Sequence, residues 1–255
     1  MRKPEDPEEH NRSDAVSDRK SEMDENVFVG GEEKMERLIV FDFDGTLTDT
    51  GLGITRSAQY ALDQMGWQHR EAEELGFFVG PPLNESFAQM GMNESECVQA
   101  VRLFRERYES IGKLEYTVYP GIGDLLCSLK ERKWRIGMAT SKPEKFAREI
   151  ADDCGFLRYF DCVSGISLTG VEGTISKAGL IQRVLDRTGF SGRRDAACMV
   201  GDRKYDIEGA RAEKLLAVGA AYGYGGRQEL ERAGADLVFD MPEEMAEAFL
   251  TNRVL

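Results

Sequence analysis

The sequence predicts an α/β protein in which a doubly wound parallel sheet carries an inserted unit made only of helices. Short apolar runs alternate along the chain with helix-like stretches of about 10–15 residues, a pattern typical of parallel strands covered by helices on both faces. The alternation is interrupted once, between residues 53 and 119, where only helical signals occur. With 41% hydrophobic residues in 255, the chain can bury a core domain and a smaller insert. These observations indicate a Rossmann-like core with an all-helical insert.

Six apolar runs are expected to form the strands of the sheet. In chain order they are RLIVFDF (37–43), WRIGMATS (134–141), FDCVSG (160–165), AACMVGD (196–202), LLAVGAAYG (215–223) and ADLVFD (235–240). Helix-like segments accompany the later runs, at 122–133, 143–156, 177–190 and 206–215. Ligands of open α/β sheets bind outside the carboxyl ends of the strands. The residues that end these runs are therefore the first candidates for a site.

The insert is expected to be a helical cap domain spanning residues 53–119. Its helical signals lie at 54–67, 83–91 and 94–112, and the stretch GFFVGPPL (76–83) interrupts them. Pro120 and Gly121 provide a hinge where the chain returns to the core. The core domain would then comprise residues 35–52 and 120–255. Residues 1–34 are polar and acidic and are predicted to be a disordered tail, with a solvated extension favoured over a partner-binding arm.

Composition argues against several classes of function. A net charge of −13 repels phosphodiester backbones, so nucleic acid is not an expected partner. No run approaches the roughly 18 apolar residues that cross a bilayer, and the N-terminus lacks the apolar centre of a secretion signal. Five cysteines without a CxxC pair fit free thiols in a reducing cytosol. We therefore expect a cytoplasmic monomer or homodimer whose partner is a small molecule, not nucleic acid or a membrane.

Three of the predicted strands end in polar residues of complementary chemistry. They are Asp42 and Asp44 after the first strand, Thr140 and Ser141 after the second, and Asp202 and Asp206 after the fourth. Carboxylates at the ends of buried strands are costly unless a positive charge pairs with them. A calcium loop of the EF-hand type does not fit, because the glycine comes too early for such a loop. The pattern favours a metal-assisted active site over a solvated turn.

Each of the first two aspartates suits a particular chemical role. Asp42 can be a nucleophile, since carboxylates attack phosphorus to give aspartyl-phosphate intermediates. Asp44 lies two residues on, so in an extended backbone it points the same way and can act as general acid and base. Gly45 allows a sharp turn, and Thr46 can fasten that turn by a hydrogen bond.

The later residues would supply a metal site and its counter-charge. Asp202 is a third carboxylate, which suits Mg²⁺, and Asp206 falls one helical turn beyond it as a second ligand or a support. So many carboxylates require a divalent cation and a lysine, and Lys177 lies at the start of a helix, where anions are favoured. Taken singly, Thr140 and Ser141 could instead cap a helix, and Lys177 could be a surface residue.

Other patterns are less informative. Two histidines and the absence of a GxSxG elbow do not support a Ser-His-Asp hydrolase. The glycine-rich stretch at 223–226 matches no phosphate-binding spacing, so a plain turn is favoured. Arg102, Arg105 and Arg107 lie on one predicted helix, where a solvated face is the favoured interpretation and contact with a substrate anion is the alternative.

Four motifs in order resemble the haloacid dehalogenase superfamily, specifically its phosphatases with a small helical cap inserted after the first motif. The motifs are DFDGT (42–46), the threonine of ATSK (139–142), Lys177 and GDRKYD (201–206). The resemblance spans about Glu36 to the C-terminus. Stretches such as VGPPLNESF and AGADLVFDMPEEM look most like the branch of phosphoglycolate phosphatases and 5′-nucleotidases.

This resemblance implies a role for each motif residue. Asp42 would be the nucleophile and Asp44 the general acid and base, while Thr140 and Lys177 would hold the phosphoryl oxygens. Mg²⁺ would be held by Asp42, the main-chain carbonyl of Asp44 and Asp202, with Asp206 assisting. An aspartate at position 44 favours transfer from a phosphate ester over dehalogenase, ion-pump or phosphonatase chemistry. At position 141 this chain has Ser where many phosphoglycolate phosphatases carry Asn.

The sequence thus predicts a Mg²⁺-dependent phosphomonoesterase that hydrolyses a small phosphorylated metabolite through an aspartyl-phosphate intermediate. Phosphoglycolate and a nucleoside monophosphate are both open as substrates. The expected substrate contacts are Thr140, Ser141 and Lys177 of the core, with Pro82 and Asn84 in a selecting loop that also contains Phe77, Phe78, Pro81 and Leu83. The alternative is a phosphosugar mutase of the β-phosphoglucomutase type, which the lack of a basic residue in the loop 76–87 disfavours. A non-catalytic binding module would have damaged motifs, and all four motifs are intact.

Overall fold

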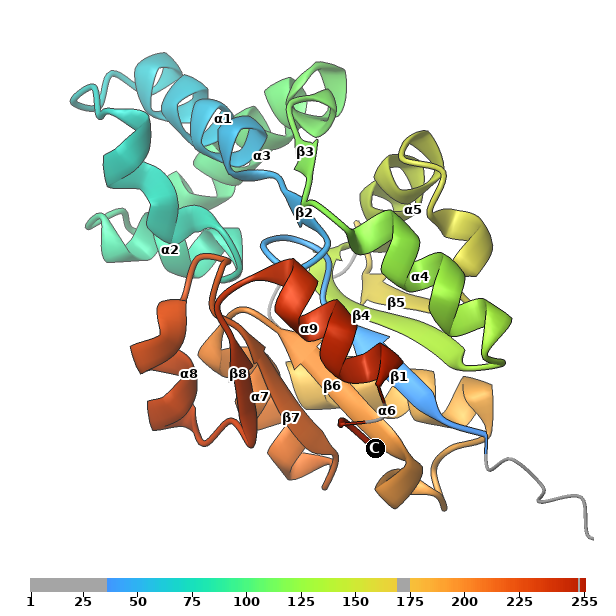
Figure 1. Ribbon diagram of the computed structural model, residues 1–255. Coiled ribbons are helices and arrows are strands. Elements are labelled where there is room, and N and C mark those ends of the chain that lie inside the picture. Colours follow the sequence, from blue (N-terminus) through green and yellow to red (C-terminus); the bar gives the residue numbers. More distant parts are fainter. Residues whose placement is uncertain (1–35, 169–174, 252) are drawn as a thin grey trace, which may run out of the picture. The chain divides into compact units, whose positions relative to one another are not determined.

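A six-stranded sheet forms the centre of the core. The computed structural model describes residues 36–168, 175–251 and 253–255, so the predicted tail, residues 1–34, lies outside the described part. The strand order is β5-β4-β1-β6-β7-β8, and every neighbouring pair is parallel (Figure 1). The strands are β1 Leu38–Phe41, β4 Arg135–Pro143, β5 Cys162–Ile166, β6 Ala197–Gly201, β7 Leu216–Ala220 and β8 Leu237–Phe239. Each lies within or overlaps one of the six predicted runs, and the predicted fold class is confirmed.

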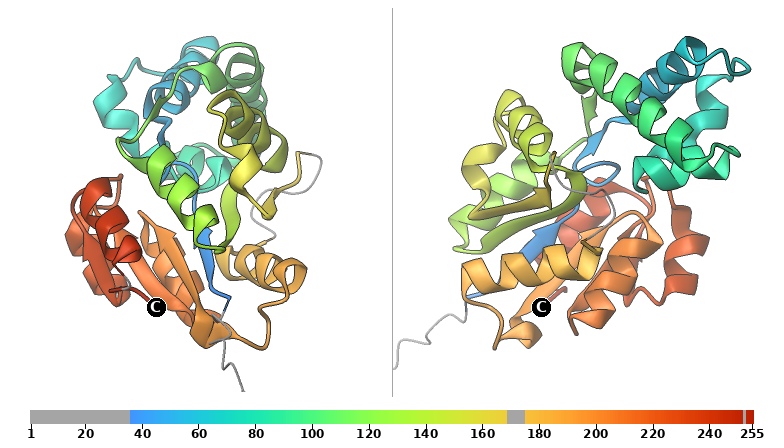
Figure 2. Two further views of the ribbon diagram at one scale, coloured as in Figure 1. Left: turned by 45° about the vertical axis from the view of Figure 1, so that its right-hand side comes forward. Right: turned by 180° about the vertical axis from the view of Figure 1, so that it is seen from behind.

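Helices cover both faces of this sheet. They are α4 Ile122–Glu131, α5 Glu144–Asp153, α6 Lys177–Thr188, α7 Lys204–Ala212, α8 Gly226–Ala233 and α9 Pro242–Leu250, with short 3₁₀ turns η3 Leu157–Tyr159 and η4 Arg194–Ala196. Ile39 and Phe41 of β1 lie in one apolar cluster with α4, α5 and α9, whereas Leu38 and Val40 lie in another with α6, α7 and α8. The two sides are seen from opposite directions in Figures 1 and 2. Because β1 is buried on both faces, its sequence is apolar throughout.

The insert consists of helices around a separate apolar cluster, to which Phe146 of α5 also belongs. Its elements are α1 Gly51–Gln64, η1 Ala72–Phe78, α2 Leu83–Gln89, α3 Glu94–Ser110 and η2 Gly112–Leu114. Helix α3 begins at Asn93, whose side chain accepts a hydrogen bond from the Glu96 amide in a reciprocal capping box. Fully buried alanines, Ala58 and Ala61 of α1 and Ala100 of α3, allow α1 and α3 to pack closely. None of the helices in the described ranges is long and apolar enough to cross a membrane.

A two-stranded ribbon joins the entry and the exit of the insert. Strand β2 (Thr48–Asp49) pairs antiparallel with β3 (Thr117–Val118), a feature that the sequence analysis did not predict. The Gly53 amide donates a hydrogen bond to the Glu115 carbonyl at 3.1 Å. A Cβ atom at Gly53 would lie 2.0 Å from the Gly112 carbonyl oxygen, so only glycine allows this approach. The two connections of the insert are therefore held side by side.

Candidate active site

Asp42 and Asp44 lie at the carboxyl end of β1, in the middle of the sheet. The Asp42 amide donates to the Val200 carbonyl at 2.9 Å, so the pairing with β6 continues to this residue. Gly45 follows with a φ of +82°, and a Cβ there would lie 2.2 Å from Asp202 Oδ2. Glycine is required both for the left-handed turn and for the contact. This turn allows Asp202 to lie close to the end of β1, beside Asp42.

Three buried carboxylates form one group. Asp42, Asp202 and Asp206 each offer an oxygen, and these oxygens lie within 4.8 Å of one another. Burial raises the pKa of Asp42 to about 7, against the lowering effect of Lys177 and with a further rise from Asp206 and Asp44. Burial, followed by the charges of Asp206 and Asp42, raises the pKa of Asp202 well above its usual range. The group is therefore short of positive charge.

Lys177 lies beside two of these carboxylates. Its Nζ is 2.9 Å from Asp42 Oδ1 and 2.8 Å from Asp206 Oδ1. Burial alone would lower the pKa of Lys177, but the charges of Asp206 and Asp42 raise it above its usual value. The lysine is the first residue of α6, and Ser176 caps that helix by accepting from the Gly179 amide. The predicted lysine and three of the predicted aspartates are thus brought together.

A second buried lysine holds Asp44, and the sequence analysis assigned it no role. Lys142 Nζ lies 2.7 and 2.9 Å from the two carboxylate oxygens of Asp44, and 4.9 Å from the centre of the Tyr108 ring. Thr50 Oγ1 also donates to Asp44 Oδ1, at 2.6 Å. Lys142 follows Thr140 by two residues in β4, and alternate residues of a strand share a face. That spacing from a predicted site residue was the signal that could have identified it.

The donors present fit a divalent cation of the magnesium type. Four aspartates, at 42, 44, 202 and 206, lie here with two lysines, at 142 and 177. When all six groups are ionised, their net charge is −2. Oxygen donors of this kind are the ligands that Mg²⁺ prefers. The side chain of Asp44 is occupied by Lys142 and Thr50, so the group of three carboxylates is the part that could hold the ion.

The glycine-rich loop at 223–226 is a turn that supports Asp202. The Tyr224 amide donates to Asp202 Oδ2 at 2.8 Å, and the Gly225 amide donates to the Asp202 carbonyl at 3.1 Å. A Cβ at Gly223 would lie 2.4 Å from Asp202 Cβ. Thr46, expected to fasten its own turn, instead donates from Oγ1 to Asp202 Oδ1 at 3.3 Å. Residues 223–225 form a turn, as the sequence predicted. Their contact with Asp202 was not predicted, because that residue lies about twenty positions away in sequence.

Thr140 and Ser141 lie at the site end of β4 and do not cap the following helix. The N-terminal cap residue of α5 is Pro143. Thr140 is buried, and its Oγ1 accepts from the Lys142 amide at 3.1 Å. Both Thr140 and Ser141 line the same cavity as Asp42 and Asp44.

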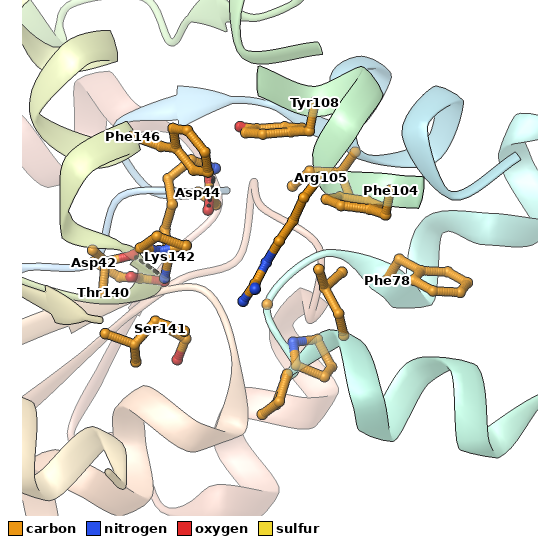
Figure 3. Close-up of a pocket in the computed structure, with 17 residues that line it drawn as sticks. Asp42, Asp44, Phe78, Phe104, Arg105, Tyr108, Thr140, Ser141, Lys142 and Phe146 are labelled. Atoms are coloured by element: carbon orange, nitrogen blue, oxygen red, sulfur yellow. Dashed lines mark hydrogen bonds and ion pairs between the residues drawn. The ribbon is translucent and has the colours of Figure 1, made fainter. Parts of the chain in front are cut away.

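This cavity extends from the carboxylates to the inserted helices (Figure 3). Its far wall is largely apolar and is formed by Ile54, Phe78, Pro81, Pro82, Leu83, Phe104 and Tyr108. Phe146 of α5 and Ile166 of β5 line it from the core. Arg105 also lines it, although the sequence analysis favoured a solvated face for that arginine. Pro82 lines both this cavity and a neighbouring one that contains Lys177 and Ser141, whereas Asn84 lines neither. Phe77 packs on Phe78 with ring centres 4.8 Å apart and is not part of the lining.

Comparison with known proteins places the chain in a family. Residues 39–220 match the family model described as haloacid dehalogenase-like hydrolase. The 5′-nucleotidase of Pseudomonas aeruginosa is 40% identical over 193 residues, which cover 75% of this chain and 86% of that protein. Tyrosine-protein kinase PtkA of Mycobacterium tuberculosis is 34% identical over 202 residues, covering 79% of this chain and 68% of that protein. Less similar relatives include phosphoglycolate phosphatases.

The solved structures agree with this placement. A crystal structure described as a predicted phosphatase from Clostridium acetobutylicum superimposes with a TM-score of 0.79 at 34% identity, covering 85% of this chain and 99% of that one. The residues that match the family model include all four aspartates of the site, at 42, 44, 202 and 206. The chain therefore belongs to the haloacid dehalogenase-like hydrolase family and is a phosphatase of that family.

Proposed function

We propose that the chain is a Mg²⁺-dependent phosphomonoesterase that acts on a small phosphorylated metabolite, with nucleoside monophosphates as the favoured substrate class. The observation that carries this proposal is the placement of Asp42 and Asp44 in one cavity, each held by its own buried lysine. Two neighbouring carboxylates in different electrostatic surroundings suit different roles in catalysis. Asp42 is then the nucleophile and Asp44 the general acid and base.

The metal would be held by Asp42, Asp202 and the main-chain carbonyl of Asp44, with Asp206 assisting. When bound, Mg²⁺ supplies the positive charge that the buried carboxylates lack and offsets charge on the phosphoryl oxygens. Lys177 is beside both Asp42 and Asp206, so it holds their carboxylates in place and can also contact a phosphoryl oxygen. The hydroxyl of Thr140 would hold another phosphoryl oxygen.

The chemistry would proceed in two displacements. A carboxylate oxygen of Asp42 forms a bond to phosphorus while the bond from phosphorus to the ester oxygen breaks, and Asp44 donates a proton to that leaving oxygen. Asp44 then takes a proton from water, whose oxygen bonds to phosphorus and releases Asp42 and inorganic phosphate. Lys142 and Thr50 would keep the Asp44 carboxyl in position through both steps.

The inserted helices, residues 53–119, would act as a cap that excludes bulk water and selects the leaving group. Their side chains form most of the far wall of the cavity, including Phe78, Phe104 and Tyr108. Exclusion of water strengthens the electrostatic interactions that support transfer. The loop containing Pro81, Pro82 and Leu83 lines the cavity beside the core.

Nucleoside monophosphates are favoured over phosphoglycolate because of the lining. A wall with several aromatic rings suits the flat base of a nucleoside better than the small, charged glycolate group. The 40% identity to a protein named 5′-nucleotidase supports the same choice.

A phosphosugar mutase is the second candidate function. The loop 76–87 has no basic residue, which disfavoured a mutase at the sequence level. Arg105 of α3 nevertheless brings a positive charge to the cavity, and a mutase needs such a group for a second phosphate. A mutase would transfer phosphate between hydroxyls of a sugar and release little of it to water.

Phosphate release from a panel of esters tests the proposal. The panel holds nucleoside monophosphates, phosphoglycolate and sugar phosphates, each with Mg²⁺ and with chelator, and Asp42→Asn is the inactive control. We expect Mg²⁺-dependent release that is fastest with a nucleoside monophosphate and absent in the variant. Release unchanged by chelator or by Asp42→Asn would contradict the proposed chemistry, and isomerisation of a sugar phosphate without release would favour the mutase.

A further inference from the structure

Arg105 extends from the inserted helices into the cavity that contains Asp42 and Asp44. It lies on α3 between Phe104 and Tyr108, which line the same cavity. In Figure 3 its side chain runs from α3 towards the space between the inserted helices and Ser141. The phosphoryl group would occupy the end with Asp42 and Thr140, so Arg105 faces the part left for the leaving group.

The other cations near the cavity do not line it from the insert side. Lys142 lies against both carboxylate oxygens of Asp44. Arg107, which donates to Glu115 at 2.8 Å and to Ser57 at 3.2 Å, does not line the cavity. Arg102, on the same helix, is exposed and does not line the cavity. Among the described residues of the lining, Arg105 is the one that carries a positive charge from the insert side.

We propose that Arg105 determines substrate specificity by binding an acceptor oxygen of the leaving group. This inference depends on the proposed phosphatase function and adds the residue that recognises the substrate. A guanidinium presents several N–H donors in a plane, which suits the carbonyl edge of a nucleobase or a carboxylate. Phe104 and Tyr108 beside it supply an apolar surface for the flat part of such a group. A hydrogen bond in these surroundings is stronger than one exposed to water.

Kinetics on substrates with and without an acceptor oxygen test this role. The variants are Arg105→Met and Arg105→Lys, with Arg102→Met as the matched control on the same helix. The substrates are uridine monophosphate, phosphoglycolate and phenyl phosphate, whose leaving group has no acceptor beyond the ester oxygen. We expect Arg105→Met to lower kcat/KM for one of the first two by roughly 10- to 100-fold, the effect of losing a charged donor. The kcat/KM for phenyl phosphate should change by less than about twofold, because its leaving group offers no acceptor for the arginine.

The pattern of losses across the three substrates shows which chemical group Arg105 binds, and it shows which outcomes overturn the proposal. A loss confined to uridine monophosphate assigns Arg105 to a base, and a loss confined to phosphoglycolate assigns it to a carboxylate. An equal loss with phenyl phosphate, or no loss with any substrate, would overturn the proposal. Wild-type protein that hydrolyses none of the three would overturn the proposed function instead. In that case calorimetric binding of uridine and of glycolate still tests Arg105, because the variant should bind one of them more weakly than wild type.

Discussion

Lys142 neutralises and positions Asp44 in the site. Asp44 would be an uncompensated buried charge without it, and the two Nζ–O distances of 2.7 and 2.9 Å fix both carboxylate oxygens. The sequence predicted the two aspartates, Asp42 and Asp44, to which we assign the reaction, because their types and spacing suit that chemistry. It did not identify Lys142, which holds Asp44, because the two-residue spacing from Thr140 indicates only a shared face of the strand and not a partner.

Replacing Lys142 tests this positioning role. Lys142→Met should lower kcat by roughly 10²-fold, the contribution of a well-placed general acid and base, with a smaller effect on KM. Lys142→Arg should retain part of the activity because it keeps the charge. Steady-state kinetics measure both values, and a thermal melt shows whether each variant is folded. Full activity in a folded Lys142→Met protein would show that Asp44 does not need this partner.

The raised pKa of Asp42 predicts a pH dependence of stability in metal-free protein. The folded-state pKa is about 7, above the ordinary value of 3.8, so folded protein binds a proton that unfolded protein has lost. Stability should therefore fall as pH rises from about 4 to about 7, because the unfolded state gains more from ionisation. Asp202, whose pKa is also raised, adds to the same trend.

Thermal melts across this pH range, with chelator, check the prediction. Wild-type Tm should decrease by several degrees, whereas Asp42→Asn should show a smaller decrease since one of the titrating groups is gone. Mg²⁺ at neutral pH should raise the Tm of wild type more than that of the variant. If the Tm of metal-free protein instead rises with pH in both wild type and variant, the pKa of Asp42 is not raised in the folded protein.

At the scale of elements, long apolar runs were predictable and short paired segments were not. All six strands of the sheet come from runs that are apolar along most of their length, and burial on both faces explains that pattern. The β2–β3 ribbon has two residues per strand, too few for a periodic signal. The placement of the loop 223–226 against Asp202 depends on tertiary contact, which no local pattern encodes.

Gly223 provides a test of that loop. A Cβ added there would lie 2.3 Å from the Gly45 carbonyl oxygen and 2.4 Å from Asp202 Cβ, so Gly223→Ala must displace one of them. Crowding of this kind costs about 1–3 kcal/mol. We expect weaker Mg²⁺ binding and at least a tenfold loss of kcat/KM, equivalent to about 1.4 kcal/mol. Gly192→Ala is the matched control, because its added Cβ meets nothing within 4 Å and should leave both values unchanged.

At the scale of the whole molecule, Arg203 connects the loop of Asp202 to the inserted helices. Its Nη1 donates to the Val79 carbonyl at 2.5 Å, and its Nε donates to Glu229 at 2.9 Å. Val79 directly precedes the stretch 80–83 that lines the cavity. The type of reaction could be predicted from the motifs, and Phe78, Pro81, Pro82 and Leu83 of the predicted loop do line the cavity. The contact between Arg203 and Val79 could not be predicted, because the two elements meet only in the folded chain.

Loss of this connection should affect substrate binding more than chemistry. Arg203→Met should raise KM by roughly tenfold and change kcat less, since the donor it removes is charged and partly buried. Arg232→Met, an exposed change on α8, is the control and should match wild type. A fall in kcat with unchanged KM would instead indicate that Arg203 acts mainly on Asp202.

The ribbon also bears on how such a protein can diversify. Thr48 pairs with Val118 and Asp49 with Thr117, so the chain leaves the core and re-enters it at adjacent points. An insertion with adjacent ends can lengthen, shrink or be exchanged without moving β1 or the residues that follow it. Mutations in residues 53–115 can therefore alter the insert side of the cavity while Asp42 and Asp44 are inherited unchanged. The fold thus separates a segment whose sequence can change from the strand and turn that position Asp42 and Asp44.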